Sequence, residues 1–241
     1  MPGQGNLKQR IRAGEQIVGV SASIKSTKSQ LENILSKDKY DYLSVDSQHS
    51  PFDENDLVRF CAAAEELDMD VMFRIKHTRH TYLIGNILDL GPSGVEVPQT
   101  ETEATVNEAL HYFYYPQKGG RSWGGAARRG IKGRDDRLTY AEYWNNYGVL
   151  WMQVESLNAI NDAKKLAKDG VDCLSWGPAD LSFNREAHPE HPLKNDDDCI
   201  KFTLEVLKGT GVRLAVRNYD YKLRDKYRAM GVTVLLERPK P

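Results

Sequence analysis

The chain has 241 residues, of which 40% are hydrophobic, so it can bury one sizeable core and is close to the usual length of a single α/β barrel. Its 33 Lys and Arg residues nearly balance 34 Asp and Glu residues, and the net charge of -1 provides no overall basic field for nucleic acid. The apolar runs are too short to span a membrane and the polar start at residues 1–4 is not typical of a signal peptide, so we expect a cytoplasmic protein.

Short β-branched runs alternate with longer helical patterns along the whole chain, which is typical of parallel βα units. In chain order, the predicted strands cover residues 17–23, 42–46, 71–75, 94–98, 149–154, 173–176, 213–216 and 233–236. Between the second and third strands, residues 54–67 carry apolar side chains at helical spacing, and Asp53 is a plausible N-cap. We predict one domain over residues 1–241, a single (β/α)₈ TIM barrel. A doubly wound open sheet is the alternative, because periodicity does not tell whether eight strands close.

One long interruption follows the fourth βα unit. Residues 117–136 are rich in Gly, Arg and Lys and show no regular apolar pattern. Loops of this length in a compact domain usually carry function or are disordered. We therefore predict a mobile loop.

Polar side chains gather where the predicted strands end, which is where the active sites of α/β barrels lie. Five adjacent strands contribute them, and the residues concerned are Asp46, Gln48, His49, Arg74, Gln99, Gln153, Glu155 and Asp180. Chemistry is therefore expected at this rim of the barrel.

Glu155 is the central polar residue of this rim. Gln153 and Glu155 lie two residues apart, so their side chains share a face of the fifth strand, the inward face if Val154 points to the helices. A buried carboxylate needs a partner, and Asp180 would bring a second negative charge close to it. The pair suits a divalent cation with hard oxygen ligands, Mg²⁺ or Mn²⁺, although Co²⁺ or Zn²⁺ is not excluded. The alternative is a salt bridge between Glu155 and Arg74 inside the barrel.

At this point the sequence resembles the HpcH/HpaI family of class II pyruvate aldolases, the 4-hydroxy-2-oxo-acid aldolases. The likeness extends over almost the whole chain. The motifs that carry it are residues 42–51 (YLSVDSQHSP), 73–74, 88–91, 94–98, Arg121 with Gly124, residues 153–155 (QVE) and 177–182 (GPADLS). Their order and spacing make the resemblance specific, whereas each piece alone is common.

The resemblance implies a ligand set for the metal and the keto acid. In the family, the residues at Glu155 and Asp180 hold the divalent cation, which pyruvate chelates through its keto and carboxylate oxygens. Gln153 and Arg74 match residues that contact the keto acid. The turn Gly177-Pro178-Ala179 matches the segment whose backbone N–H groups bind the substrate carboxylate.

The resemblance also implies an acid/base pair, with His49 as the proton carrier and Asp46 behind it. Histidine is the only residue type at this rim that ordinarily gains and loses a proton near neutral pH, and Asp46 could fix the tautomer of His49. Arg74 would place positive charge where the oxygen of an enolate develops, and a metal on the keto oxygen would act as a Lewis acid. His49, Asp46 and Arg74 are therefore the predicted catalytic residues.

Two further positions of the family pattern are open to two interpretations. Asp89 matches a carboxylate near the acceptor side of the site, but a charge at a helix end explains it equally well. Trp176 either lines the pocket or is packing. Gln48 stands where the family usually has Glu, and Gln99 where it has Met, so the pocket for the second substrate is expected to differ from that of well-known members.

The end of the chain also departs from the family. Pro241 follows the eighth predicted strand closely, where the family continues into a terminal helix exchanged between subunits. We expect a barrel that lacks this swapped helix and that forms a homo-oligomer, without presuming the family's hexamer.

The resulting hypothesis is a metal-dependent lyase that reversibly cleaves a 4-hydroxy-2-oxo acid to pyruvate and an aldehyde through a metal-stabilised pyruvate enolate. Two alternatives stay open. The first is an enolate enzyme with a different electrophile, like the relatives that make citrate or macrophomate. The second is a non-catalytic homologue that binds keto acids.

Overall fold

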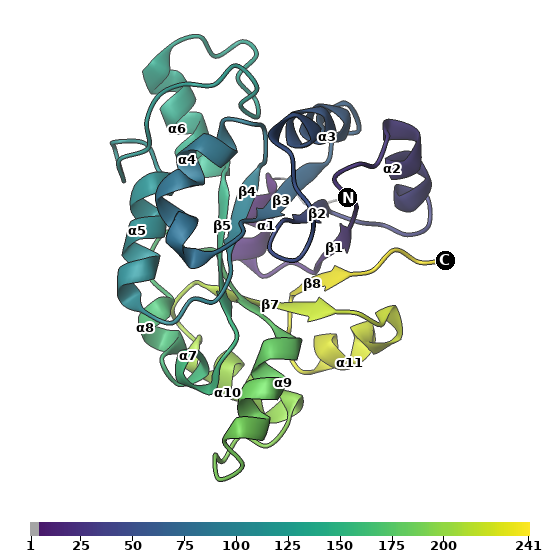
Figure 1. The fold of residues 1–241 in the computed structure, drawn as a ribbon, viewed down its shortest axis with the longest axis vertical. Coiled ribbons are helices and arrows are strands. Elements are labelled where there is room, and N and C mark those ends of the chain that lie inside the picture. Colours follow the sequence, from purple (N-terminus) through teal and green to yellow (C-terminus); the bar gives the residue numbers. More distant parts are fainter. Residues whose placement is uncertain (1–4) are drawn as a thin grey trace.

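The barrel closes completely. The structure, a computed structural model, describes residues 5–241, so the polar start at residues 1–4 lies outside the described part. Eight parallel strands follow one another around the barrel in chain order, and β8 pairs with β1 (Figure 1). The strands are β1 Ile17–Ser21, β2 Tyr42–Asp46, β3 Asp70–Arg74, β4 Gly94–Val97, β5 Val149–Val154, β6 Cys173–Trp176, β7 Arg213–Asn218 and β8 Val234–Glu237. The predicted TIM-type barrel is confirmed and the open sheet is excluded.

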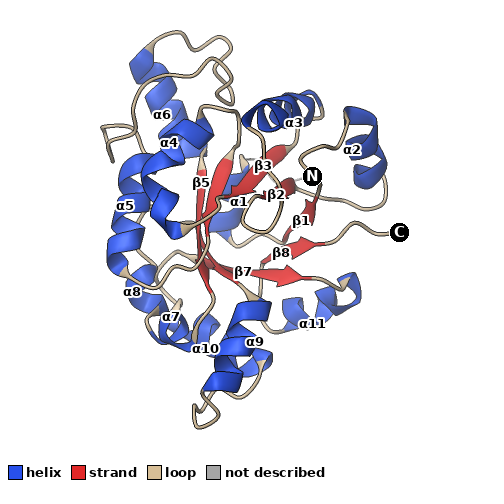
Figure 2. Cartoon of the chain, viewed as in Figure 1, coloured by secondary structure: helices blue, strands red, loops and turns tan. Residues whose placement is uncertain are grey.

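Helices surround the outside of the barrel (Figure 2). They are α1 Leu7–Ala13, α2 Lys28–Leu35, α3 Glu54–Glu66, α4 Ile84–Leu88, α5 Glu103–Phe113, α6 Arg137–Tyr147, α7 Leu157–Asn161, α8 Ala163–Leu166, α9 Pro178–Ala187, α10 Asp196–Val206 and α11 Arg224–Ala229, with short 3₁₀ helices η1 Thr78–Leu83 and η2 Tyr221–Leu223. Asp53 caps α3 as predicted, because its side chain accepts hydrogen bonds from the backbone of Asn55 and Asp56. No helix within residues 5–241 has the length and apolar character needed to cross a membrane.

The first helix closes the end of the barrel at which the strands begin. Leu7 and Ile11 of α1 are buried and pack in the same apolar cluster as the inward residues Ile17 and Trp151. The sequence pattern did not indicate this helix, because its apolar face is short and gains stability only by docking onto the barrel.

The long segment between α5 and α6 packs against the barrel instead of standing free. Arg128 stacks on Trp123, with its guanidinium carbon 3.9 Å from the ring centroid, and Arg121 is almost completely buried. Arg121 also forms an ion pair with Asp89 at 2.7 Å. A loop is found here as predicted, with no helix or strand between Phe113 and Arg137. Its arginines contact aromatic rings and a carboxylate, and a pattern of apolar residues does not reveal such contacts.

The interior of the barrel changes character along its axis. On β2, Tyr42, Ser44 and Asp46 alternate with outward residues and so point inward. Tyr42 belongs to the apolar cluster beside α1, whereas Asp46 ends the strand and is only partly buried. Apolar side chains thus fill the barrel near its beginning, and polar ones collect where the strands end.

Candidate active site

Arg74 is fixed at the end of β3 by two neighbouring strands. Its Nε donates to Oδ1 of Asp46 at 2.8 Å and its Nη2 to Oδ2 at 2.7 Å, while Nη1 donates to Oε1 of Gln153 at 3.2 Å. The pairing follows from the register, because Asp46 of β2 lies directly beside Arg74 of β3. A guanidinium carries five N–H donors, so these three bonds leave two for a ligand.

Asp46 remains ionised as a result of this contact. Burial alone would raise the pKa of Asp46, but the hydrogen bonds and charge of Arg74 outweigh burial and lower the pKa. The carboxylate therefore acts as the counter-charge that holds Arg74 in one orientation.

Glu155 follows β5 and forms no ion pair with a residue of the described range 5–241. Its side chain is buried, and its one hydrogen bond comes from the backbone N–H of Gln99, which reaches Oε2 at 2.8 Å. Burial raises the pKa of Glu155 to about 7; the N–H of Gln99 opposes this rise and the negative charge of Asp180 adds to it. The proposed alternative, a salt bridge to Arg74, is not formed, because Arg74 pairs with Asp46.

This lack of a partner sets Glu155 apart from the other buried acids. Within residues 5–241 four acidic side chains are buried, and three of them form ion pairs. The pairs are Glu96 with Arg217, Asp172 with Lys8, and Glu237 with Arg224. Glu155 alone among the four forms no ion pair, although the nearby charge of Arg74 opposes the rise of its pKa. A buried carboxylate in this state is suited to bind a cation.

The start of α9 lies directly against Glu155. A Cβ atom added to Gly177 would stand 2.5 Å from Oε1 of Glu155, so this close approach requires glycine. Pro178 is the first residue of the helix, and Asp180 lies in its first turn with an exposed side chain. Pro178 has no N–H, and the N–H of Gly177 donates to the carbonyl of Val154 at 3.2 Å. The N–H groups of Ala179 and Asp180 in the first turn are therefore the ones that can bind an anionic group.

These residues fit a divalent cation. A buried carboxylate without a counter-charge stands close to a second, exposed carboxylate, and both offer hard oxygen ligands. In the described part of the chain, no cluster of three or more His, Cys, Asp or Glu side chains is arranged to hold a metal. A cation held by Glu155 and Asp180 would therefore keep positions open for oxygens of a substrate and for water.

His49 and Asp46 do not touch each other. His49 lies three residues beyond the end of β2, is exposed, and forms no hydrogen bond with any residue of the described range 5–241. Both oxygens of Asp46 face Arg74, and Oδ1 also accepts the backbone N–H of Gln48 at 2.9 Å. The predicted contact of Asp46 with His49 is thus replaced by one with Arg74, whose charge and register favour it.

Two predicted substrate-binding residues lie away from this rim. Asp89 follows α4 and precedes β4, so it is at the end of the barrel where strands begin, and there it pairs with Arg121. Trp176 is buried in the apolar layer between the barrel and its helices. Within one chain, Asp89 thus lies at a helix end in an ion pair, and Trp176 packs among apolar side chains.

Sequence reasoning missed a second polar group inside the barrel, made of Glu96, Ser175 and Arg217. Oε1 of Glu96 accepts a hydrogen bond from Oγ of Ser175 at 2.7 Å, and Oε2 accepts one from Nη2 of Arg217, also at 2.7 Å. The available signal was a charged residue in the middle of the apolar strand Gly94–Val97.

Comparison with known proteins places this geometry in a family. The sequence profile described as "HpcH/HpaI aldolase/citrate lyase" matches residues 24–195. A hydroxypyruvate/pyruvate aldolase from Roseobacter denitrificans is 32% identical over 190 residues, covering 76% of this chain and 73% of that protein. A 2-keto-3-deoxy-L-rhamnonate aldolase from Escherichia coli O17:K52:H18 is 29% identical over 192 residues, covering 76% and 70%. Among solved structures, an aldolase/citrate lyase family protein from Burkholderia cenocepacia J2315 superposes with a TM-score of 0.82 at 27% identity, covering 96% of this chain and 91% of that one.

Proposed function

Because the chain belongs to the HpcH/HpaI aldolase/citrate lyase family, we propose that it is a divalent-metal-dependent aldolase that reversibly cleaves a 4-hydroxy-2-oxo acid into pyruvate and an aldehyde. The observation that carries the proposal is the buried Glu155 without a positive partner, next to Asp180 at the start of α9. The relatives named hydroxypyruvate/pyruvate aldolase and 2-keto-3-deoxy-L-rhamnonate aldolase support a keto-acid substrate.

Glu155 and Asp180 would hold Mg²⁺ or Mn²⁺, with Co²⁺ or Zn²⁺ as possible substitutes. A bound cation would supply Lewis-acid polarisation of the substrate's keto group. Glu155 is suited to this task because a cation would replace the proton that its raised pKa lets it keep near neutral pH.

The keto acid would be oriented by groups that the fold already holds in place. Arg74 has two N–H donors left after its bonds to Asp46 and Gln153, and these would meet the oxygen on which negative charge develops. The N–H groups of Ala179 and Asp180, in the first turn of α9, would bind the carboxylate.

His49 would move the proton in this scheme. In the cleavage direction it accepts the proton of the C4 hydroxyl group, the C3–C4 bond breaks, and C4 becomes the aldehyde carbon. The electron pair of that bond forms the enolate, whose C3 takes up a proton to give pyruvate. Since His49 is exposed at the rim, it can exchange its proton with solvent between turnovers.

Deuterium exchange into the methyl group of pyruvate, followed by NMR in D₂O, tests the enolisation step without an aldehyde. We expect exchange that requires Mg²⁺ or Mn²⁺, stops with EDTA, and falls by at least about a hundredfold in Glu155→Ala. Glu186→Gln, an exposed change on the outer part of α9, serves as the matched control. Exchange that is independent of metal, or full exchange in Glu155→Ala, contradicts the proposal.

The same experiment separates the two rival functions. Metal-dependent exchange in the absence of turnover with any aldehyde points to an enolate enzyme with a different electrophile. A melting temperature that rises with Mg²⁺ and oxalate, without any exchange, points to a protein that binds keto acids and does not turn them over.

A further inference from the structure

The turn after β4 contacts Glu155 through one backbone group. The N–H of Gln99 donates to Oε2 of Glu155 at 2.8 Å. The N–H of the next residue, Thr100, donates to the carbonyl of Gln153 at 2.8 Å. The turn therefore holds the end of β5 by its backbone and the residue that follows β5 by its carboxylate.

Gln99 adopts an unusual backbone conformation to make this contact. Its φ angle of 48° lies in the left-handed region, and Asp68 is the only other non-glycine residue of the range 5–241 with a positive φ. This region is unfavourable for a residue that has a Cβ atom. The side chain of Gln99 is exposed, so its own packing does not explain the strain. Strain of this kind persists where the surrounding structure imposes it, and it is common at functional sites.

The neighbours of Gln99 keep the turn rigid. The ring of Pro98 fixes the φ angle of the residue before it. Thr100 is completely buried, and its Oγ1 donates to the carbonyl of Val97 at 3.2 Å. The N–H of Gln99 is therefore held in one place from both sides.

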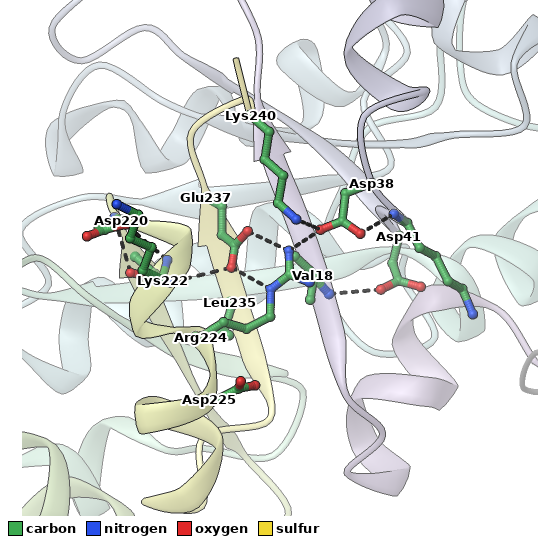
Figure 3. Close-up of polar contacts among 12 residues, drawn as sticks. Val18, Asp38, Asp41, Asp220, Lys222, Arg224, Asp225, Leu235, Glu237 and Lys240 are labelled. Atoms are coloured by element: carbon green, nitrogen blue, oxygen red, sulfur yellow. Dashed lines mark hydrogen bonds and ion pairs between the residues drawn. The ribbon is translucent and has the colours of Figure 1, made fainter.

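Glu237, another buried acid at the end of a strand, is an example of a carboxylate with both oxygens bound. Nε of Arg224 donates to its Oε1 at 2.9 Å, and Nη2 donates to its Oε2 at 2.7 Å (Figure 3). In Glu155 only Oε2 accepts a hydrogen bond from a residue of the range 5–241, and that donor is uncharged. Oε1 faces Gly177, where an added Cβ atom would stand 2.5 Å from it. Glu155 thus has one fixed oxygen and one free oxygen.

We propose that Gln99 is a positioning residue whose backbone N–H fixes Oε2 of Glu155 and leaves Oε1 as the oxygen that binds the divalent cation. The inference rests on the proposed metal-dependent function, and it adds the ligand atom and the group that orients it. An N–H that already holds the carboxylate lowers the entropy lost when a cation binds. Because this donor carries no net charge, it orients the carboxylate without repelling the cation as an arginine would.

The first experiment removes this single N–H. Lactic acid in place of Gln99, introduced by nonsense suppression, converts the amide between residues 98 and 99 into an ester. Gln99→Ala is the matched reference, because it has the same side chain and keeps the N–H. Calorimetric titration with Mn²⁺ measures the dissociation constant of each protein. We expect the ester protein to bind Mn²⁺ about ten- to a hundredfold more weakly than Gln99→Ala does.

A second experiment uses the wild-type protein and identifies the oxygen. Hydrogen exchange of the Gln99 amide, followed by NMR, reports whether its bond to Oε2 of Glu155 is present. We expect this amide to be as protected with Mg²⁺ bound as without it, since the cation takes Oε1. Loss of protection when Mg²⁺ binds means that the cation takes Oε2, and the inference is then wrong. This experiment also decides the matter if circular dichroism finds the ester protein unfolded.

Failure of the inference is distinguishable from failure of the proposed function. The ester could lower the free energy of unfolding in EDTA and leave the dissociation constant of Mn²⁺ equal to that of Gln99→Ala. The hydrogen bond would then have only a structural role, and the inference would be wrong. The aldolase proposal would still stand if the wild type exchanges pyruvate protons with Mn²⁺. A wild-type protein that binds no Mn²⁺ instead refutes the proposed metal-dependent function.

Discussion

Replacing Glu155 with Gln should stabilise the metal-free protein at neutral pH, although the same change should abolish metal binding. The amide has the shape of the carboxylate, stays neutral at every pH, and keeps an oxygen that can accept the N–H of Gln99. What the substitution removes is a negative charge that is buried without a cation. The expected gain is therefore the energy that the folded chain loses by ionising Glu155.

The size of the gain follows from the pKa of Glu155. Burial raises the pKa from 4.5 to about 7, so between these values the folded chain binds more protons than the unfolded chain. For a raised pKa, the stability contributed by the neutral carboxyl group is complete below about pH 4.5 and is lost as the pH rises through about 7. At about 1.4 kcal/mol per pKa unit, the full loss is about 3 kcal/mol.

Urea unfolding with EDTA at pH 4.5, 6 and 8 measures this difference. Glu155→Gln should match the wild type at the lowest pH and exceed its free energy of unfolding by about 3 kcal/mol at the highest. With Mn²⁺ present the order should reverse, because only the wild type gains stability from the ion. Glu186→Gln, an exposed change, should follow the wild type throughout. Two results would refute the reasoning. One is a Glu155→Gln variant that is no more stable than the wild type at pH 8, and the other is a variant whose advantage in the free energy of unfolding is as large at pH 4.5 as at pH 8.

Two further predictions concern Asp38 and Gly177. The ammonium group of Lys240, together with Arg224, lowers the pKa of Asp38 to about 2; the stability from this pair is therefore present above about pH 4 and lost as the pH falls toward 2. Asp38→Asn should lower the free energy of unfolding by about 1 kcal/mol at pH 7. Between pH 4 and pH 2 the free energy of unfolding should depend less on pH in the variant than in the wild type, and urea unfolding at several pH values measures this. Gly177→Ala should weaken Mn²⁺ binding by about tenfold or more in calorimetric titration, because its Cβ would lie 2.5 Å from Oε1 of Glu155 and displace that ligand; unchanged affinity would contradict this placement.

The barrel was predictable from the sequence because its strands are local signals. Each βα unit carries a short β-branched run, and the observed strand ends differ from the predicted ones by at most two residues. The helix α1 and the segment before α6 were not predictable in this way. Both are stabilised by contacts between parts of the chain that are distant in sequence. Ile11 lies in one apolar cluster with Trp151, and Arg121 forms an ion pair with Asp89.

The sequence predicted which polar residues lie at the rim of the barrel, but not which of them contact one another. Alternation along β5 correctly puts Gln153 on the inward face, where its side chain meets Arg74. The resemblance to the family implied a contact between Asp46 and His49, which lie three residues apart. Register decides otherwise, since β2 and β3 place Asp46 beside Arg74, and register depends on how strands align rather than on residue type.

The lack of an ion-pair partner for Glu155 is best explained by its proposed function as a metal ligand. Opposite charges are supplied to the other buried acids by arginine or lysine side chains from neighbouring elements. An arginine facing Glu155 would recover much of the roughly 3 kcal/mol that ionisation costs, yet its guanidinium would fill the space that a cation needs. Proteins keep such local instability where a ligand later removes it. The metal-free chain should therefore be least stable at the position where the proposed enzyme binds most strongly, and this coupling is what the pH dependence of Glu155→Gln measures.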